Sequence, residues 1–341
     1  MSVSAVITVA GIAGLAVTFL LGFSFVPFIG KLEFGNTFDV REKRKPVVSS
    51  GGIILAIGTV SAVVLAVATD RITGGDIVVS GSLVGQEMYT KLWSGILMAL
   101  SFSLVGLIDD YFKIKTQKNL GVPVKQKAVM QFFVILAYLT GLYMGMNGKP
   151  YMFVPFFGNT EPGFFYWIIG IILIYAAVNA VDITDGVNGL CGGVTLTAAV
   201  SLGIIAAIKG FFGFTAMSAA LAGSCAGFIL LNGKSLKINI GRTGTMFLGG
   251  MLVAISYAIG CPIILFLSGL SFFVIGATDV IQIIYYKRTG GRPLFKSAPV
   301  QHHLKLNGWS DKKITLTFTA LNIFGGVAAV AAMYFGGYIL R

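Results

Sequence analysis

The stretch FFYWIIGIILIYAAVNAVDITDGVNGLCGGVTLTAAVSLGIIAAI, residues 164–208, decides the fold class of this chain. Its two apolar segments, 164–181 and 189–208, each approach the ~20 residues that a helix needs to cross the hydrocarbon core of a bilayer. Almost no loop separates them, yet the connection and the end of the first segment together carry two aspartates and two asparagines. The stretch therefore predicts two transmembrane helices joined by a polar turn at one membrane surface.

Long apolar segments of this kind recur along the whole chain of 341 residues. Hydrophobic residues make up 56% and charged residues only 11%, whereas about a quarter of a soluble domain is charged. We therefore expect an all-α polytopic membrane protein that forms a single domain over residues 1–341. The first segment lacks a basic start and a cleavage site, so it is interpreted as a retained helix. The ten expected spans are 5–30, 51–69, 92–110, 128–146, 164–181, 189–208, 211–231, 244–260, 262–284 and 315–339.

The Lys and Arg residues divide the connecting loops into two groups. With ten spans, alternate loops lie on the same side, and one group carries twenty of the 25 Lys and Arg residues. By the positive-inside rule this group faces the cytoplasm, so both termini lie outside. Topology explains most of this charge, so the net charge of +12 does not predict nucleic-acid binding. The basic group consists of loops 31–50, 111–127, 182–188, 232–243 and 285–314.

Two acidic motifs lie on the predicted cytoplasmic side. In the first, Asp109 and Asp110 end an apolar run, where carboxylates are costly unless they are hydrated, paired or bound to a cation. A divalent ion or a nearby lysine such as Lys113 is a natural partner. The alternative is a hydrated helix end beside a basic loop.

The second acidic motif is the polar turn itself. Asn179, Asp182, Asp185 and Asn188 follow one another at three-residue steps, which places them along one face of a helix or helical turn. Four polar side chains between two membrane spans need a hydrated or charged cavity to face. The motif therefore indicates a binding or catalytic role.

A glycine-rich motif, IGRTGTMFLGG at residues 240–250, leads into another predicted helix. Asn232, Lys234 and Lys237 precede it. A glycine-rich turn at a helix N-terminus can offer backbone N–H groups to a phosphate, although such turns are common in membrane helices.

His302 and His303, the chain's two histidines, are adjacent in the most basic loop. They are candidates to bind phosphate, carry a proton or ligate a metal, and the alternative is a solvated pair without a role. Carboxylates that hold Mg²⁺ beside Lys and Arg would suit a diphosphate substrate, whose charge the metal neutralises.

These motifs resemble those of the polyprenyl-phosphate N-acetylhexosamine-1-phosphate transferase family. The likeness covers nearly the whole chain, and KSAPVQHHLKLNGW at residues 296–309 is similar to the muramoyl branch rather than the N-acetylglucosamine branch. The other strings that carry it are LIDDYFKI (107–114), NLGVPVKQKAVMQ (119–131), NAVDITDGVNGL (179–190) and IGRTGTMFLGG (240–250).

The resemblance implies a multi-pass protein of the bacterial plasma membrane with ten helices and a cytoplasmic active-site cleft. Its implied reaction transfers phospho-MurNAc-pentapeptide from UDP-MurNAc-pentapeptide to undecaprenyl phosphate, giving lipid I and UMP for peptidoglycan synthesis. Mg²⁺ is the implied cofactor, and a homodimer the implied assembly. The alternatives are a UDP-GlcNAc:polyprenyl-phosphate GlcNAc-1-phosphate transferase and a catalytically impaired paralogue.

The resemblance also implies roles for individual residues. Asp109 and Asp110 would lie at the phosphates, one of them as a candidate base, and Lys127 would bind phosphate. Asn188 would contact the uracil, and the two histidines the donor's phosphate or sugar. The full catalytic set is Asp109, Asp110, Asp185, His302 and His303; the substrate-binding set is Lys113, Lys127, Asn179, Asp182, Asn188, Asn232, Arg242 and Gln301; the metal set is Asp109, Asp110, Asp182 and Asp185.

The chain departs from the family's pattern at four of these positions and in one loop. Asp182 stands where Asn is usual, Asn188 where Asp is usual, and Gln301 replaces the first of three histidines. The early loop FDVREKRKPVVSSGG is short and lacks the family's histidine. Arg242 stands in place of a metal-binding Asp, and its charge would repel Mg²⁺ by a few kcal/mol at roughly 4 Å. We therefore expect a rearranged metal seat made by the four aspartates of the metal set, with loss of activity as the rival interpretation.

A secondary transporter is the alternative from a different class. Transporters place their coupling residues near the bilayer midplane, often in interrupted helices with repeat symmetry. Most acids of this chain instead lie on the basic side, many of them at predicted helix ends, whereas Asp279 lies within a span near its cytoplasmic end, and no internal repeat is evident.

Overall fold

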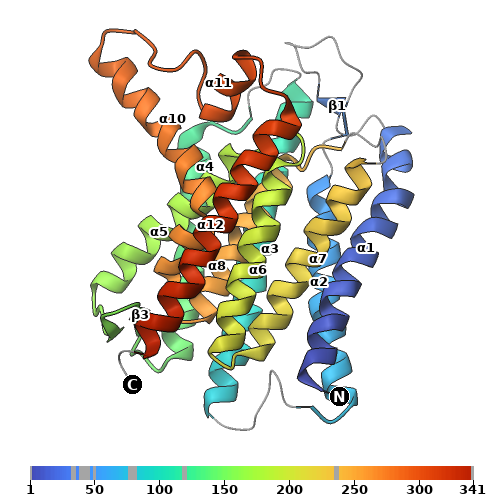
Figure 1. Ribbon diagram of the computed structural model, residues 1–341, viewed down its shortest axis with the longest axis vertical. Helices are drawn as coiled ribbons and strands as arrows, with labels where there is room; N and C mark the ends of the chain where they lie inside the picture. The colour runs from blue at the N-terminus through green and yellow to red at the C-terminus, as the bar shows by residue number, and fades with distance from the viewer. Residues whose placement is uncertain are drawn as a thin grey trace.

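The computed structural model describes residues 2–31, 36–37, 47–48, 51–75, 83–116, 121–233 and 238–338, and these form a bundle of long helices (Figure 1). Most of the basic loop 31–50, together with Lys234 and Lys237, lies outside the described residues. The helices are α1 (Val3–Lys31), α2 (Gly51–Ile72), α3 (Leu83–Thr116), α4 (Val124–Gly145), α5 (Phe165–Ile183), α6 (Leu190–Ile208), α7 (Phe212–Gly233), α8 (Gly241–Ala258), the 3₁₀ turn η1 (Pro262–Ile264), α9 (Leu265–Ser268), α10 (Leu270–Arg288), α11 (Val300–Leu306) and α12 (Asp311–Tyr338). Two short antiparallel pairs accompany them, β1 (Asn36–Thr37) with β2 (Val47–Val48) and β3 (Met152–Val154) with β4 (Gly158–Thr160).

Nine helices among the described residues are long and apolar enough to cross a membrane, which confirms the predicted all-α polytopic fold. The remaining expected span, 244–260, corresponds to α8, which is not among these nine helices. Every residue of α8 except Arg242 is buried. Because α8 is enclosed by other helices rather than by lipid, its small and polar residues serve helix packing.

The expected span 262–284 is not one continuous helix, and this prediction is corrected. The chain forms η1 and α9, breaks at Gly269 and resumes as α10. Backbone groups freed by a break inside a membrane must be satisfied by the protein itself. Asn322 of α12 does this, because its amide donates to Ser268 O at 3.0 Å and its carbonyl accepts the Ser271 N–H at 3.2 Å.

Glycines let α1 and α7 pack backbone against backbone. A Cβ on Gly223 would overlap the carbonyl oxygen of Gly11, and a Cβ on Gly227 would lie 2.5 Å from Leu15 O. Helices in a membrane gain little from hydrophobic contact with one another, so close approach of this kind is a main source of their cohesion.

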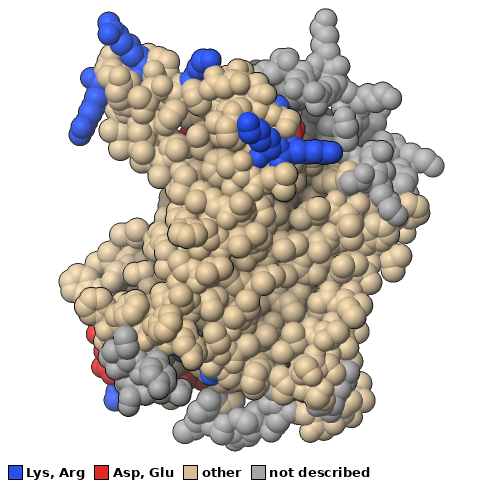
Figure 2. Space-filling view, viewed as in Figure 1, with Lys and Arg blue, Asp and Glu red and all other residues tan. Residues whose placement is uncertain are grey.

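Both termini lie at one end of the bundle, and α11 lies at the other end together with the C-terminal end of α10 (Figure 1). On the face seen in Figure 2, exposed Lys and Arg gather at the α10 and α11 end, and the middle of that face shows no charged side chain. Such a belt fits a hydrocarbon environment, where charge is costly. The arrangement agrees with the expected alternation of loops, while the side that faces the cytoplasm stays a prediction.

Candidate active site

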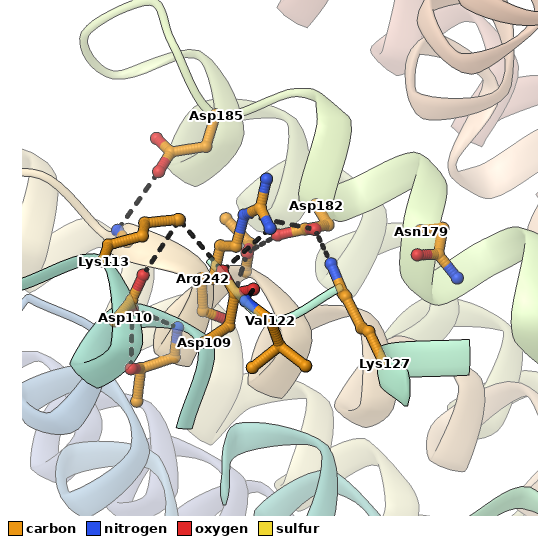
Figure 3. Close-up of polar contacts among 12 residues, drawn as sticks. Asp109, Asp110, Lys113, Val122, Lys127, Asn179, Asp182, Asp185 and Arg242 are labelled. Atoms are coloured by element: carbon orange, nitrogen blue, oxygen red, sulfur yellow. Dashed lines mark hydrogen bonds and ion pairs between the residues drawn. The ribbon is translucent and has the colours of Figure 1, made fainter. Parts of the chain in front are cut away.

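The predicted acidic motifs meet at the end of the bundle opposite the termini (Figures 1 and 3). Two glycines allow this convergence. Gly106 on α3 lets the first turn of α8 approach, since a Cβ there would lie 2.5 Å from the carbonyl carbon of Arg242. Gly121 lets the chain before α4 close over Asp109, because a Cβ there would lie 2.7 Å from both the Cγ and Oδ2 atoms of that carboxyl group.

Asp109 is the most enclosed of the acidic groups, with a fully buried side chain. Its Oδ2 accepts the Arg242 Nη1 donor at 2.8 Å and lies 3.0 Å from Lys113 Nζ. Its Oδ1 accepts the Val122 N–H at 2.9 Å. A buried carboxylate is tolerated when it is paired and hydrogen-bonded in this way. Asp109 thus holds three donors that come from α3, α8 and the segment just before α4.

Asp110 turns toward the start of α8. Its Oδ2 accepts both the N–H and the hydroxyl of Thr243, each at 2.9 Å, and Lys113 Nζ lies 3.4 Å from Oδ1. The first N–H groups of a helix lack partners within the helix and carry partial positive charge, so a carboxylate is stabilised there. Asp110 therefore fixes α8 against α3.

Asp182, in the last turn of α5, accepts donors from two other helices. Lys127 Nζ of α4 lies 2.7 Å from Oδ2, and the Thr245 hydroxyl of α8 donates to Oδ1 at 2.7 Å. Arg242 Nε lies 3.9 Å from the same Oδ2. Arg242 therefore stands between Asp109 and Asp182 (Figure 3). The two acidic motifs, predicted to converge, are joined through this one guanidinium.

Asp185 lies beyond the end of α5 and is held differently. Its Oδ2 accepts the Gly241 N–H at 3.1 Å, and no described residue donates a hydrogen bond to its Oδ1. Burial, with the charge of Asp182 adding to it, raises the pKa of Asp185 from 3.8 to about 6. Asp185 is therefore a carboxyl group with one free oxygen and a pKa close to neutrality.

The three-residue spacing of the polar turn does not carry all four of its residues into this cluster. Because α5 ends at Ile183, the helical repeat stops before Asp185 and Asn188. Asn179 exchanges hydrogen bonds with Gln131 of α4 at 3.2 and 3.4 Å and lies apart from the cluster in Figure 3. Asn188 has an exposed side chain, and its carbonyl accepts the Thr315 hydroxyl at 3.1 Å.

The residues predicted on α11 point in different directions. Gln301 is fully buried and donates to Ile183 O at 3.0 Å, which ties α11 to the end of α5. The ring of His302 lies against the turn after Asp185, since a Cβ on Gly186 would lie 2.8 Å from its Cε1.

His303 faces its own loop instead. Its Nδ1 accepts the Lys296 N–H at 3.1 Å, and its Nε2 lies 2.9 Å from the Asn307 amide. Asn232 is likewise engaged locally, because its amide group both donates to and accepts from the backbone of Ile238. The structure thus brings His302 to the acidic cluster but not His303 or Asn232.

The four predicted metal ligands do not form the expected seat. Among the described residues, no three or more His, Cys, Asp or Glu side chains are grouped so that they could hold a metal ion. The physical reason is that Asp109, Asp110 and Asp182 already accept cationic and neutral donors, while Asp185 faces the start of α8.

Thr243 and Thr245 are the site residues that sequence reasoning did not single out. Each donates its hydroxyl to one of the aspartates, from the first turn of α8. The sequence did offer a signal: the two threonines lie two residues apart in the glycine-rich motif, and Thr243 directly follows Arg242.

Comparison with known proteins agrees with this geometry. A family model described as glycosyl transferase family 4 matches residues 92–260, which contain the whole acidic cluster. The chain is 30% identical over 319 residues to the phospho-N-acetylmuramoyl-pentapeptide-transferase of Listeria innocua, covering 91% of this chain and 93% of the relative. It is 29% identical over 336 residues to the same-named protein of Bacillus cereus strain AH187, covering 96% of each.

The fold, the site and the comparisons together define a membrane-embedded transferase that is similar to glycosyl transferase family 4. Within that class, the chain belongs to the phospho-N-acetylmuramoyl-pentapeptide-transferase family. The resemblance inferred from the motifs is confirmed.

Proposed function

We propose that this protein transfers phospho-MurNAc-pentapeptide from UDP-MurNAc-pentapeptide to undecaprenyl phosphate, forming lipid I for peptidoglycan synthesis. An oxygen of the lipid phosphate attacks the phosphorus that bears the sugar. The bond from this phosphorus to the bridging oxygen breaks, and UMP leaves. The names of relatives that are similar over nearly the whole chain support this reaction, and they do not favour the UDP-GlcNAc alternative.

The observation that carries the proposal is the gathering of three cations around the acidic cluster. Lys113, Lys127 and Arg242 come from three helices, and each keeps part of its side chain exposed, at 18%, 12% and 39%. Donor and acceptor bring three phosphate groups to the site. Fixed positive charges stabilise the charge that develops on the leaving phosphate, and ion pairs with buried carboxylates hold those charges in place.

Asp185 is the group best placed to take a proton from the acceptor phosphate. A general base works best when its pKa lies near the operating pH, and the pKa of Asp185 is raised to about 6. The free Oδ1 leaves it able to accept a proton, whereas both oxygens of Asp109 and of Asp110 already accept donors. This assignment places the base in the polar turn rather than at the end of α3.

Mg²⁺ dependence is the remaining part of the expectation from the family. As arranged, the donor set of this site does not fit a protein-bound divalent ion, because the four carboxylates form no metal-binding group. No step of the proposed reaction is therefore assigned to a metal.

The setting of the reaction is proposed along with it. We infer a single multi-pass unit over residues 1–341 in the bacterial plasma membrane, with the acidic cluster facing the cytoplasm, where UDP-linked donors are made. A homodimer, and the absence of a nucleic-acid partner, stay predictions.

The test is to incubate the purified full chain in detergent with undecaprenyl phosphate and UDP-MurNAc-pentapeptide, with UDP-GlcNAc in parallel, and to follow UMP. We expect UMP and a lipid-linked diphosphate product with the muramoyl donor. Asp185→Asn should lower kcat by a factor of about 10² to 10⁴. Glu161→Gln, an exposed acid beyond β4, is the matched control and should leave the rate unchanged. Because detergent leaves no sealed compartment, UMP release also excludes a transporter, whereas its absence with both donors would refute the proposal.

A further inference from the structure

The guanidinium of Arg242 joins two carboxylates that belong to different helices. Its Nη1 lies 2.8 Å from Asp109 Oδ2, and its Nε lies 3.9 Å from Asp182 Oδ2. A divalent ion bound between these carboxylates would compete with the guanidinium for their oxygens. The arginine therefore occupies the position that such an ion would take, with a charge of the same sign.

Two lysines make this position still less open to a metal. Lys113 Nζ lies 3.0 Å from Asp109 Oδ2, and Lys127 Nζ lies 2.7 Å from Asp182 Oδ2. Each of the two oxygens thus faces two cationic groups. A divalent ion would have to displace these cationic groups or remain beside them against the repulsion of like charges.

The contacts with the two carboxylates leave part of the Arg242 guanidinium unused. Its side chain is 39% exposed, and its ion pairs use Nη1 and Nε, while Nη2 makes no hydrogen bond to any described residue. A guanidinium carries five N–H donors in a planar fork that matches the oxygens of a phosphate. The Nη2 group, with any N–H of Nη1 that Asp109 does not use, can therefore bind an anion while Nη1 and Nε face the two carboxylates.

We propose that Arg242 is a substrate-binding residue for the diphosphate of the nucleotide donor, and that its guanidinium replaces a protein-bound divalent ion between Asp109 and Asp182. The inference rests on the proposed function, since it assigns a ligand to the same site. It also gives the chain's most serious departure from its family's pattern a role within the reaction.

The first experiment asks whether the site holds a metal, with Mn²⁺ as the probe. Electron paramagnetic resonance of free Mn²⁺ is recorded with the purified full chain in detergent, without nucleotide. The unmodified protein should leave the free signal unchanged, as should Arg71→Gln, a matched control on the exposed end of α2. Arg242→Asp removes the cation and adds a third carboxylate, so it should bind about one Mn²⁺ per chain.

The second experiment asks whether Arg242 binds the anion, with UDP as the probe in the presence of EDTA. Isothermal titration calorimetry should show UDP binding to the unmodified protein. Arg242→Gln loses hydrogen bonds from a charged donor, so its affinity for UDP should be about ten- to a hundredfold lower. Arg242→Lys keeps the charge but not the fork, so it should fall between, and Arg71→Gln should bind UDP normally.

Two results would overturn the inference. One is Mn²⁺ binding by the unmodified protein that is lost in Asp182→Asn. The other is unchanged UDP binding by Arg242→Gln. The melting temperature of Arg242→Gln is measured to show that it folds, so that this test remains even if Arg242→Asp does not fold. If either occurs while UMP is still released, the proposed function stands without the inference. If UDP binds through Arg242 but no UMP is released, the proposed function fails and the anion site stands.

Discussion

The ion pair between Lys127 and Asp182 should stabilise the fold, and removing the aspartate should destabilise the protein more than removing the lysine. The atoms Nζ and Oδ2 lie 2.7 Å apart, and only 12% and 8% of the side chains are exposed. Coulomb attraction at this distance is about 6 kcal/mol at an effective dielectric constant of 20, and desolvation offsets much of it. Asp182→Asn leaves a nearly buried ammonium without its partner and should cost about 3 kcal/mol. Lys127→Met should cost only about 1–2 kcal/mol, because Asp182 keeps the Thr245 hydroxyl and can draw Arg242 closer than 3.9 Å.

Thermal unfolding followed with a thiol-reactive fluorophore can measure this difference. The three free cysteines are all buried and react only when the protein unfolds; they are Cys191, Cys225 and Cys261. At roughly 2 °C per kcal/mol, Tm should fall about 6 °C in Asp182→Asn and about 2–4 °C in Lys127→Met. The double variant should fall short of the sum by about 1–2 kcal/mol. Lys305→Met breaks an exposed 3.1 Å pair with Asp311 and should shift Tm by less than 2 °C. Additive losses, or equal losses in the two single variants, would refute the reasoning.

Three further predictions concern stability. The pKa of Asp185 is raised to about 6, so the folded state keeps a proton that the unfolded state releases above about pH 4. Tm should therefore decline between pH 4 and 6 more steeply in the unmodified protein than in Asp185→Asn. Parallel curves of Tm against pH for the two proteins would contradict this. Gly223→Val should push α1 from α7 and cost about 1–3 kcal/mol in the same melting assay, whereas Gly141→Val, which has no atom within 4 Å of the added Cβ, should cost less. Asn322→Ala removes the side chain that satisfies the break before α10 and should lower stability by about 3 kcal/mol, a prediction that a Tm within 1 °C of the unmodified protein would exclude.

The fold could be predicted from the sequence because the bilayer reduces the problem to length and polarity. Nine of the ten expected spans, α8 among them, correspond to continuous helices. Their ends differ by up to nine residues, as at the start of α3, since hydropathy does not mark where a helix continues into the polar region. The break within 262–284 gave no such signal. Serine and glycine, which stand at the break, are common in membrane helices, and the group that makes the break tolerable, Asn322, lies 51 residues from Ser271. Only the packing of α12 against α9 and α10 reveals it.

The candidate site was predicted in part, and its errors share one cause. Adjacent residues on a helix point about 100° apart, so neighbours in sequence need not share partners. Asp109 faces Arg242 while Asp110 faces Thr243, although Lys113 contacts both, and both directions lead into the site. The histidines diverge in the same way, but only His302 turns toward the acidic cluster. A doublet in sequence therefore predicted a location correctly without predicting a shared role.

Arg242 shows most clearly where a motif stops being informative. Judged by position alone, a cation in place of a metal ligand suggests either a displaced metal or a lost activity, because a motif reports residue type and not partners. The partners come from elsewhere: Asp109 lies 133 residues away on α3, and Asp182 lies on α5. Once the guanidinium is seen to be hydrogen-bonded to Asp109 and ion-paired with Asp182, a third interpretation becomes available, in which the positive charge is kept and its carrier is changed. Phosphate binding depends on the sign and placement of charge, which a fixed guanidinium supplies as well as an ion. A substitution that looks disabling in the motif is therefore compatible with the same chemistry in the folded site.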